Sequence, residues 1–300
     1  MRFPVVCSCL LLRALAGFTQ SPAIYEVVIH EIMPKPAPAK GLPPYEYIEL
    51  RNISHAAVQL KDWRLAVNKR EVVLPDFLLQ PDSLLLLCAP AAEGSYHLSN
   101  TREIAHFPAL ADDGALIVFY NPHHEVMHAV AYDPRWYRDP GLSKGGVSLE
   151  MIDPAFPCSG KINWQASSSP AGGTPGTANA AAAVATDNSR PDLLYAAITD
   201  SLHVLLQFSK TLDSSLAAAP SHYRLSGGLQ PMRCTVIPPL FDKVELQLSA
   251  AIQPQQVYTL TATGLADCNN AASGVKNTLT LGLPQRPGKH DVVINELLFY

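Results

Sequence analysis

Hydrophobic positions in this chain fall into short runs that alternate with polar residues, and clusters of turn-forming residues separate the runs. Between residues 26 and 165 the runs include "YEYIELRNIS", "VQLKDWRLAV" and "GALIVFYNPHHEVMHAVAY". Runs of this length that are rich in Val, Ile, Leu, Tyr and Phe and bounded by Pro, Gly, Asn and Asp are typical of β-strands. No stretch keeps a helical period over three turns, so the pattern predicts an all-β sandwich.

A second set of strand-like runs follows a segment rich in small and turn-forming residues, "SSSPAGGTPGTANAAAAVATDNSRPD". The later runs include "LHVLLQFSKTLD", "VELQLSAAI" and "VYTLTATGL", with the turn spacing of an Ig-like sandwich. The predicted fold is therefore all-β, with two Ig-like β-sandwich domains in series joined by flexible linkers. The domains are expected over residues 24–179 and 191–284, with linkers at 180–190 and 285–290.

The last ten residues repeat the pattern of the first predicted strand. "DVVINELLFY", residues 291–300, aligns without gaps with "EVVIHEIMPK", residues 26–35, and each run holds a Glu among apolar positions. The separation is too long for a solenoid repeat. Ten residues cannot bury a core. We therefore expect residues 291–300 to be the truncated start of a second copy of the first domain.

The N-terminal sequence and the net charge limit where the protein is expected to act and which partners it is expected to bind. The N-terminus, "MRFPVVCSCLLLRALAGFTQS", places an Arg before a short apolar run and small residues after it, which predicts a secretory signal peptide over residues 1–20. A buried N-terminal element is the alternative. No later stretch is long and apolar enough for a membrane span. The net charge of −4 does not favour binding to the negatively charged backbone of a nucleic acid. We expect a secreted or cell-surface protein.

Removal of the signal peptide leaves four cysteines, two in each predicted domain. They are Cys88 and Cys158, and then Cys234 and Cys268. An even count in an exported chain fits one disulfide per domain, so we predict the pairs Cys88 with Cys158 and Cys234 with Cys268. Buried free thiols are the alternative.

Several ordered motifs carry a family resemblance. "VVIHEIMPKPAPAKGLPPYEYIELRNIS", "VQLKDWRL", "SLEMIDPAFPC", "NWQAS" and "GGTPGTAN" together resemble the bacterial lamin-tail domain of exported surface proteins, over about residues 24–179. The second region, with "VLLQFSKTLD" and "YTLTATGLADCNN", resembles a bacterial Ig-like domain of surface-layer proteins. The resemblance implies the order lamin-tail, Ig-like, lamin-tail, and it is compatible with accompanying enzymes because lamin-tail domains also occur beside them.

The sequence contains only weak candidates for a metal-binding site. The segment "HEVMH", His124 to His128, matches a zinc-protease motif. In that motif both histidines bind the metal from one face of a helix. Here the pattern predicts a β-hairpin whose histidines face the solvent. A calcium site from Glu31, Glu46 and Glu49 lacks an Asp-rich loop with ligand spacing. Asp267 to Asn270 is expected to be a turn. We predict no metal and no cofactor.

Aromatic residues supply the one candidate ligand contact. Trp63 and Trp164 lie in strand-like motifs and are expected in the core. Trp136 lies in the Pro- and Gly-bounded loop "DPRWYRDPG" with Arg135, Tyr137 and Arg138. Aromatic faces stack on sugars and cations, so this loop is the predicted contact for a cell-surface polysaccharide or another surface protein.

The predicted function follows from the modules and from the lack of a recognisable catalytic motif. We expect a non-enzymatic exported protein that acts as a cell-surface or extracellular scaffold or adhesion element. The alternative is a set of N-terminal targeting modules for a secreted hydrolase or nuclease whose catalytic domain lies beyond residue 300.

Overall fold

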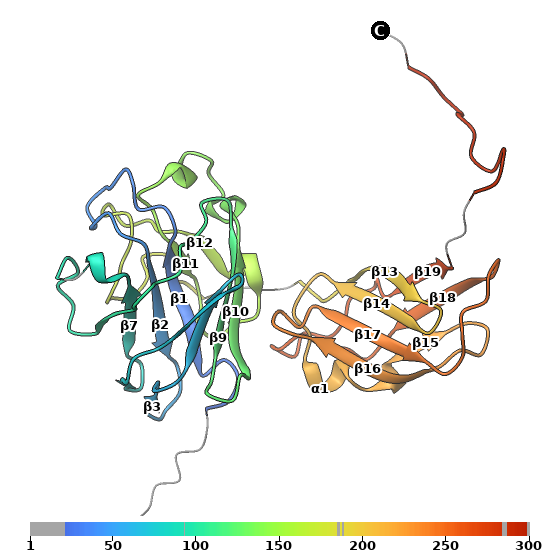
Figure 1. Cartoon of the computed structure of the whole chain (residues 1–300), viewed down its shortest axis with the longest axis horizontal. Helices are drawn as coiled ribbons and strands as arrows, with labels where there is room; N and C mark the ends of the chain where they lie inside the picture. Colours follow the sequence, from blue (N-terminus) through green and yellow to red (C-terminus); the bar gives the residue numbers. More distant parts are fainter. Residues whose placement is uncertain (1–21, 93, 185–186, 188, 284–286, 299–300) are drawn as a thin grey trace, which may run out of the picture.

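The computed structural model describes residues 22–92, 94–184, 187, 189–283 and 287–298. They form two β-sandwich domains that lie side by side along the long axis of the molecule (Figure 1). This confirms the predicted all-β, Ig-like class. The predicted signal peptide, residues 1–20, lies outside the described residues.

The first domain consists of two main sheets and a small two-stranded one. The larger sheet has the order β12-β11-β1-β2-β7-β8, and the facing sheet has the order β10-β9-β4-β5. Its strands are β1 Val27–Met33, β2 Tyr47–Asn52, β3 Val58–Gln59, β4 Arg64–Val67, β5 Arg70–Val73, β6 Leu78–Leu79, β7 Leu84–Cys88, β8 Thr101–Glu103, β9 Ala115–Tyr120, β10 Val126–Tyr132, β11 Leu149–Met151 and β12 Trp164–Ala166. Short 3-10 turns are η1 Pro90–Ala92, η2 Pro134–Tyr137, η3 Leu142–Lys144 and η4 Gly160–Asn163.

The second domain packs a four-stranded sheet, order β13-β14-β17-β16, on a three-stranded sheet, order β15-β18-β19. Its elements are β13 Leu193–Asp200, β14 His203–Phe208, α1 Ser214–Ala217, η5 Pro220–His222, β15 Tyr223–Leu225, β16 Pro231–Ile237, β17 Lys243–Leu248, β18 Val257–Ala262 and β19 Thr278–Gly282. Every second residue of β14 and β17 is buried. This period of two is what places one face of a strand in a sandwich core.

Strand β1 departs from that alternation because both of its faces are covered, and all seven of its residues are buried. It pairs with β2 on one side and with β11 on the other. One face joins the main core, which contains Ile29, Ile32, Trp63 and Trp164. The burial of both tryptophans confirms their predicted core positions.

The C-terminal run that resembles β1 is arranged differently. Among the described residues 287–298 there is no strand, and the side chains of Val292, Ile294 and Leu298 are about four-fifths exposed, at 79%, 80% and 82%. In Figure 1 this segment extends away from the second domain. Its assignment as the start of another domain stays a prediction.

Candidate functional site at the domain junction

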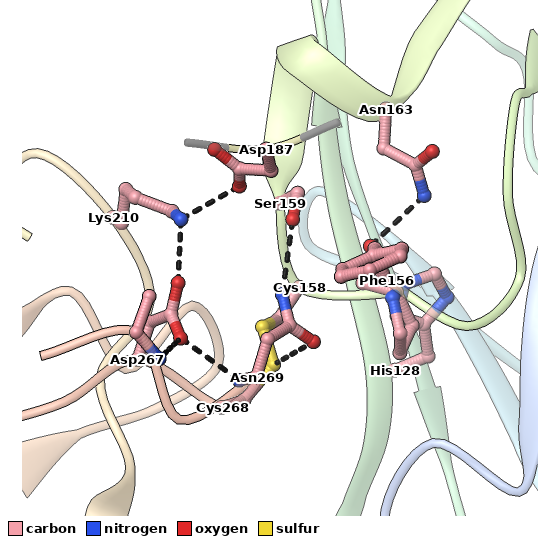
Figure 2. Close-up of a disulfide and its surroundings, with 12 residues drawn as sticks. His128, Phe156, Cys158, Ser159, Asn163, Asp187, Lys210, Asp267, Cys268 and Asn269 are labelled. Atoms are coloured by element: carbon pink, nitrogen blue, oxygen red, sulfur yellow. Dashed lines mark hydrogen bonds and ion pairs between the residues drawn. A yellow bond between two sulfur atoms is a disulfide. The ribbon is translucent and has the colours of Figure 1, made fainter. Parts of the chain in front are cut away.

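A disulfide between Cys158 and Cys268 joins the two domains (Figure 2), with their Cα atoms 6.3 Å apart. Cys158 lies shortly before η4 of the first domain, and Cys268 lies in the turn after β18 of the second. Beside the bridge, the side-chain amide of Asn269 donates a hydrogen bond to Ser159 Oγ at 3.1 Å. The domains are therefore connected covalently at a second point besides the chain itself.

The predicted disulfide pairs, Cys88 with Cys158 and Cys234 with Cys268, are wrong. Cys88 is a buried free thiol in a small cluster with Met33 and Tyr47, and Cys234 is a buried free thiol in the second core. Burial raises the pKa of each thiol to about 11. The prediction assumed that each domain closes its own bridge, whereas folding brings two loops from different domains together.

A buried ion-pair network lies next to the disulfide. Lys210 Nζ is 2.5 Å from Asp267 Oδ2 and 2.6 Å from Asp187 Oδ2 (Figure 2). These three side chains are 6%, 1% and 2% exposed. Burial tends to raise the pKa of Asp187, but hydrogen bonds from Lys210, Ser189 and Ser159 outweigh it and bring the pKa to about 2.

The sequence did not single out Lys210 or Asp187. Asp187 lies in the predicted flexible linker at residues 180–190, and Ala181 of the same segment is held by a hydrogen bond to Glu150. Both positions therefore contact the folded domains, Asp187 through Lys210 and Ala181 through Glu150. Asp267 was expected to form a turn, and it does, since its Oδ1 accepts hydrogen bonds from the backbone of Asn269 and Ala271. The ion pair adds a second role that depends on loops far apart in the sequence.

A pocket of about 330 Å³ opens between the domains. The first domain contributes residues of β10, η2 and η4 to it, and the second contributes the segments that follow β14 and β16. Its walls combine aromatic, aliphatic and cationic side chains, among them Trp136, Lys161, Ile162, Lys210 and Leu240. It can therefore take a ligand with both an apolar face and polar groups.

The predicted ligand loop, Arg135 to Arg138, borders this pocket only in part. Arg135 and Trp136 line it. Trp136 packs against Trp164 with ring centroids 6.0 Å apart and ring planes inclined at 42°. Tyr137 is buried and donates a hydrogen bond to the Val147 carbonyl at 3.1 Å, so it serves the core.

The two arginines of this loop are also engaged. Arg135 forms an ion pair with Asp133 while its side chain stays 90% exposed. Arg138 points its guanidinium to the carbonyls of Ile162 and Trp164 at 3.4 and 3.5 Å. Arg135 and Trp136 therefore remain as the contact candidates.

Three buried carboxylates form a row across the larger sheet of the first domain. Glu31 on β1 lies opposite Glu49 on β2 and opposite Glu150 on β11, and all three are 0% exposed. Glu31 was the unexplained polar residue of the first apolar run. Its Oε1 accepts hydrogen bonds from Tyr47 and Ser148, both at 2.6 Å.

The segment 172–181 crosses this row and is bound to it. Thr174 N donates to Glu31 at 2.9 Å, Thr174 Oγ1 donates to Glu150 at 2.7 Å, and Gly176 N donates to Glu49 at 2.5 Å. Asn179 donates to the carbonyls of His30 and Met151. We call residues 172–181 the strap, because they cover the face of the sheet away from the main core.

Burial changes the ionisation of the row. It raises the pKa of Glu31 to about 7, with the Glu49 charge adding to the rise and hydrogen bonds from Ser148, Tyr47 and Thr174 opposing it. Burial raises the pKa of Glu49 to about 8 against the Gly176 hydrogen bond. His30, 3.4 Å from Glu49, has its pKa lowered to about 3 by burial and by Arg51, so it faces Glu49 as a neutral ring.

The "HEVMH" segment belongs to the β9–β10 hairpin, as predicted. The expectation of solvent-facing histidines is wrong for His128, which is 1% exposed. Its Nδ1 accepts a hydrogen bond from Ile29 N at 2.9 Å, and its Nε2 donates to the Pro157 carbonyl at 3.1 Å. Burial lowers its pKa to about 4 despite that second bond. Both ring nitrogens are used in packing the sandwich.

The described part of the chain offers neither a metal-binding cluster nor a membrane-spanning helix. No group of three or more His, Cys, Asp or Glu side chains within the described ranges is arranged to hold a metal ion. Likewise, the described helices include none with the length and apolar character needed to cross a membrane.

Comparison with known proteins finds a family match within the first domain. The lamin tail domain family matches residues 20–134. This span includes β1 to β10 and ends before β11, β12 and the strap. No curated protein matches the chain.

Among solved structures, the chain is similar to the S-layer protein rSbsC(31-844), with 19% identity and a TM-score of 0.30, over 32% of this chain and 14% of that one. It is also similar to the N-terminal part of the bacterial S-layer protein SbsC, with 20% identity and a TM-score of 0.28, over 32% of this chain and 24% of that one. The matched part thus spans less than a quarter of each of these two S-layer chains. Likenesses this remote carry no information on function.

Proposed function

We propose that this chain, whose residues 20–134 match the lamin tail domain family, is a non-enzymatic, exported modular protein. It acts outside the cytoplasm as a scaffold or adhesion element that presents two β-sandwich modules in a defined arrangement. The observation that carries the proposal is the disulfide between Cys158 and Cys268. Disulfides persist in oxidising compartments, and a bridge between modules holds them as one unit.

The pocket at the junction supports a binding role. The half-buried Trp136 and the exposed Arg135 and Lys161 lie at one wall. Aromatic rings stack on the apolar faces of sugar rings, and cationic donors bind hydroxyl or carboxylate groups. We propose a cell-surface polysaccharide as the ligand, with the mouth of this pocket as its contact.

Export is tested by fractionation of a bacterial host that secretes proteins. The full chain should appear outside the cytoplasm with Cys158 and Cys268 protected from alkylation. A version without residues 1–20 should stay inside with both thiols reactive. If the full chain remains in the cytoplasm, the export part of the proposal fails.

Binding is tested by co-sedimentation of the purified full chain with insoluble cell-surface polysaccharide. Trp136→Leu keeps an apolar contact to Trp164 but removes the stacking face. We expect the affinity to fall at least about fivefold, since one stacked aromatic contributes roughly 1–3 kcal/mol. Tyr195→Ala is the matched control, because Tyr195 is 49% exposed on β13 and does not line the pocket. Equal losses in both variants, or none in either, contradict the proposed contact. Turnover of ester, glycoside or phosphodiester substrates by the same preparation contradicts the non-enzymatic part.

A further inference from the structure

The amine of Lys210 is held against two carboxylates in a buried site beside the pocket between the domains. Nζ is 2.5 Å from Asp267 Oδ2 and 2.6 Å from Asp187 Oδ2, and it also donates to the Ser189 carbonyl at 3.2 Å (Figure 2). All three charged side chains are more than nine-tenths buried. An ordinary ion pair here is costly to desolvate, and the same geometry places an amine beside a carboxyl carbon.

The carboxyl group of Asp267 is oriented by the turn that contains it. Its Oδ1 accepts hydrogen bonds from Asn269 N at 2.9 Å and from Ala271 N at 2.8 Å, while its Oδ2 faces Lys210. Two backbone N–H groups on one oxygen are the arrangement that stabilises the oxyanion of a tetrahedral intermediate in acyl transfer. One oxygen is thus held as the future carbonyl, and the other lies toward the amine.

We propose that Lys210 and Asp267 join in an intramolecular amide bond, with Asp187 as the proton carrier. Asp187 takes one proton from Lys210 Nζ and passes it to Oδ2 of Asp267, and the neutral amine then attacks Cγ of the protonated carboxyl group. A C–N bond forms, and negative charge gathers on Oδ1 between the two backbone donors. The bond from Cγ to Oδ2 then breaks. Oδ2 takes up a second proton from Nζ and leaves as water.

The reaction balances without any other reactant. An ammonium and a carboxylate become a neutral amide and one water molecule, and nothing is oxidised or reduced. One positive and one negative charge disappear from the buried site. Asp187 ends in its starting form and keeps its hydrogen bonds from Ser189 N and Oγ.

The position of the bond gives it a structural purpose. Lys210 follows β14 of the four-stranded sheet, and Asp267 follows β18 of the three-stranded sheet, so the amide links the two sheets of the second sandwich. Asp267 also precedes Cys268, which is bonded to Cys158 of the first domain. The result is a continuous covalent path from the first domain across both sheets of the second. Such a path would resist unfolding by a pulling force, as expected of a scaffold or adhesion element.

The test is the mass of the purified full chain after complete reduction and denaturation, corrected for any removal of N-terminal residues. We expect a mass lower than that of the sequence by one water molecule. After proteolysis, fragmentation should find one branched peptide in which Lys210 and Asp267 are joined. A reduced chain with the unaltered sequence mass overturns the proposal.

Variants separate this bond from other losses of water. Lys210→Arg keeps the positive charge but cannot form the amide, and it should have its full calculated mass. A deficit that persists in this variant indicates a succinimide elsewhere and overturns the proposal. Asp267→Asn should form the same product with loss of ammonia instead of water.

The proton carrier is tested with Asp187→Ala, which should retain the full calculated mass in most molecules. Formation of the Cys158–Cys268 disulfide in each variant shows that the junction has folded. If Asp187→Ala is cross-linked as completely as the unaltered chain, the role given to Asp187 is wrong.

Discussion

Cys158 of the first domain is bonded to Cys268 of the second across 110 residues of sequence. Two sandwiches that share only a linker can rotate freely, whereas a second connection limits their relative motion. The hydrogen bond from Asn269 to Ser159 lies beside the bridge and reinforces it. The pocket between the domains exists only while this junction is closed, so its shape depends on the bridge.

We expect peptide mapping without reduction to find the Cys158–Cys268 peptide pair, with Cys88 and Cys234 alkylated only after denaturation because both are buried. Cys158→Ser should lower the free energy of unfolding by at most about 5 kcal/mol, the chain-entropy value for a loop of this length. It should also increase the radius of gyration in solution scattering. Cys88→Ala leaves the bridge intact and is the control. An unchanged radius for Cys158→Ser would show that noncovalent contacts alone hold the domains.

The carboxylate row makes stability depend on pH. An unfolded Glu has a pKa near 4.3, and the pKa of folded Glu49 is about 8. Between these values the folded protein binds more protons than the unfolded chain. The contribution of Glu49 is therefore complete below about pH 4 and is lost as the pH rises through 8.

Glu49→Gln imitates the protonated form and should reduce this loss by on the order of 3 kcal/mol between pH 5 and pH 8. Urea titrations at several pH values measure it. Glu245→Gln on β17 of the second domain, outside the row, should leave the pH dependence unchanged. Parallel pH curves for the unaltered chain and Glu49→Gln would mean that Glu49 is ionised in the folded protein.

The strap should be a stability element of the first domain. Asn179→Ala removes two hydrogen bonds, to the carbonyls of His30 at 3.1 Å and Met151 at 2.8 Å. Leaving buried acceptors unpaired costs about 1–3 kcal/mol, so we expect a loss of that size in chemical denaturation. Thr177→Ala on the exposed side of the strap is the control. A loss below about 0.5 kcal/mol would show that the strap opens without unfolding the domain.

Hydrogen exchange should distinguish the two similar apolar runs. Amides of Val27 to Ile32 lie in the fully buried strand β1, between β2 and β11, and should exchange only on unfolding of the domain. Amides of Val292 to Leu297 lie in no strand and should exchange within the shortest labelling time. Protection of the second run would place it on a sheet edge and contradict its exposed arrangement outside any strand.

The strand content, the two sandwiches and the lamin tail resemblance could be predicted from the sequence, because each rests on local patterns. A strand with every second position buried, such as β14, shows its period directly in its letters. The core positions of Trp63 and Trp164 followed in the same way.

The contacts between distant segments were decided by the tertiary structure. Which cysteines meet depends on which loops the two domains turn toward each other, so Cys158 bonds Cys268 and leaves Cys88 and Cys234 free. Glu31 appeared as one polar residue in an apolar run, and only strand register places it between Glu49 and Glu150. Lys210 and Asp267 are 57 residues apart. Local propensity carries no information about such a pair, because its geometry arises when two sheets close over a common core.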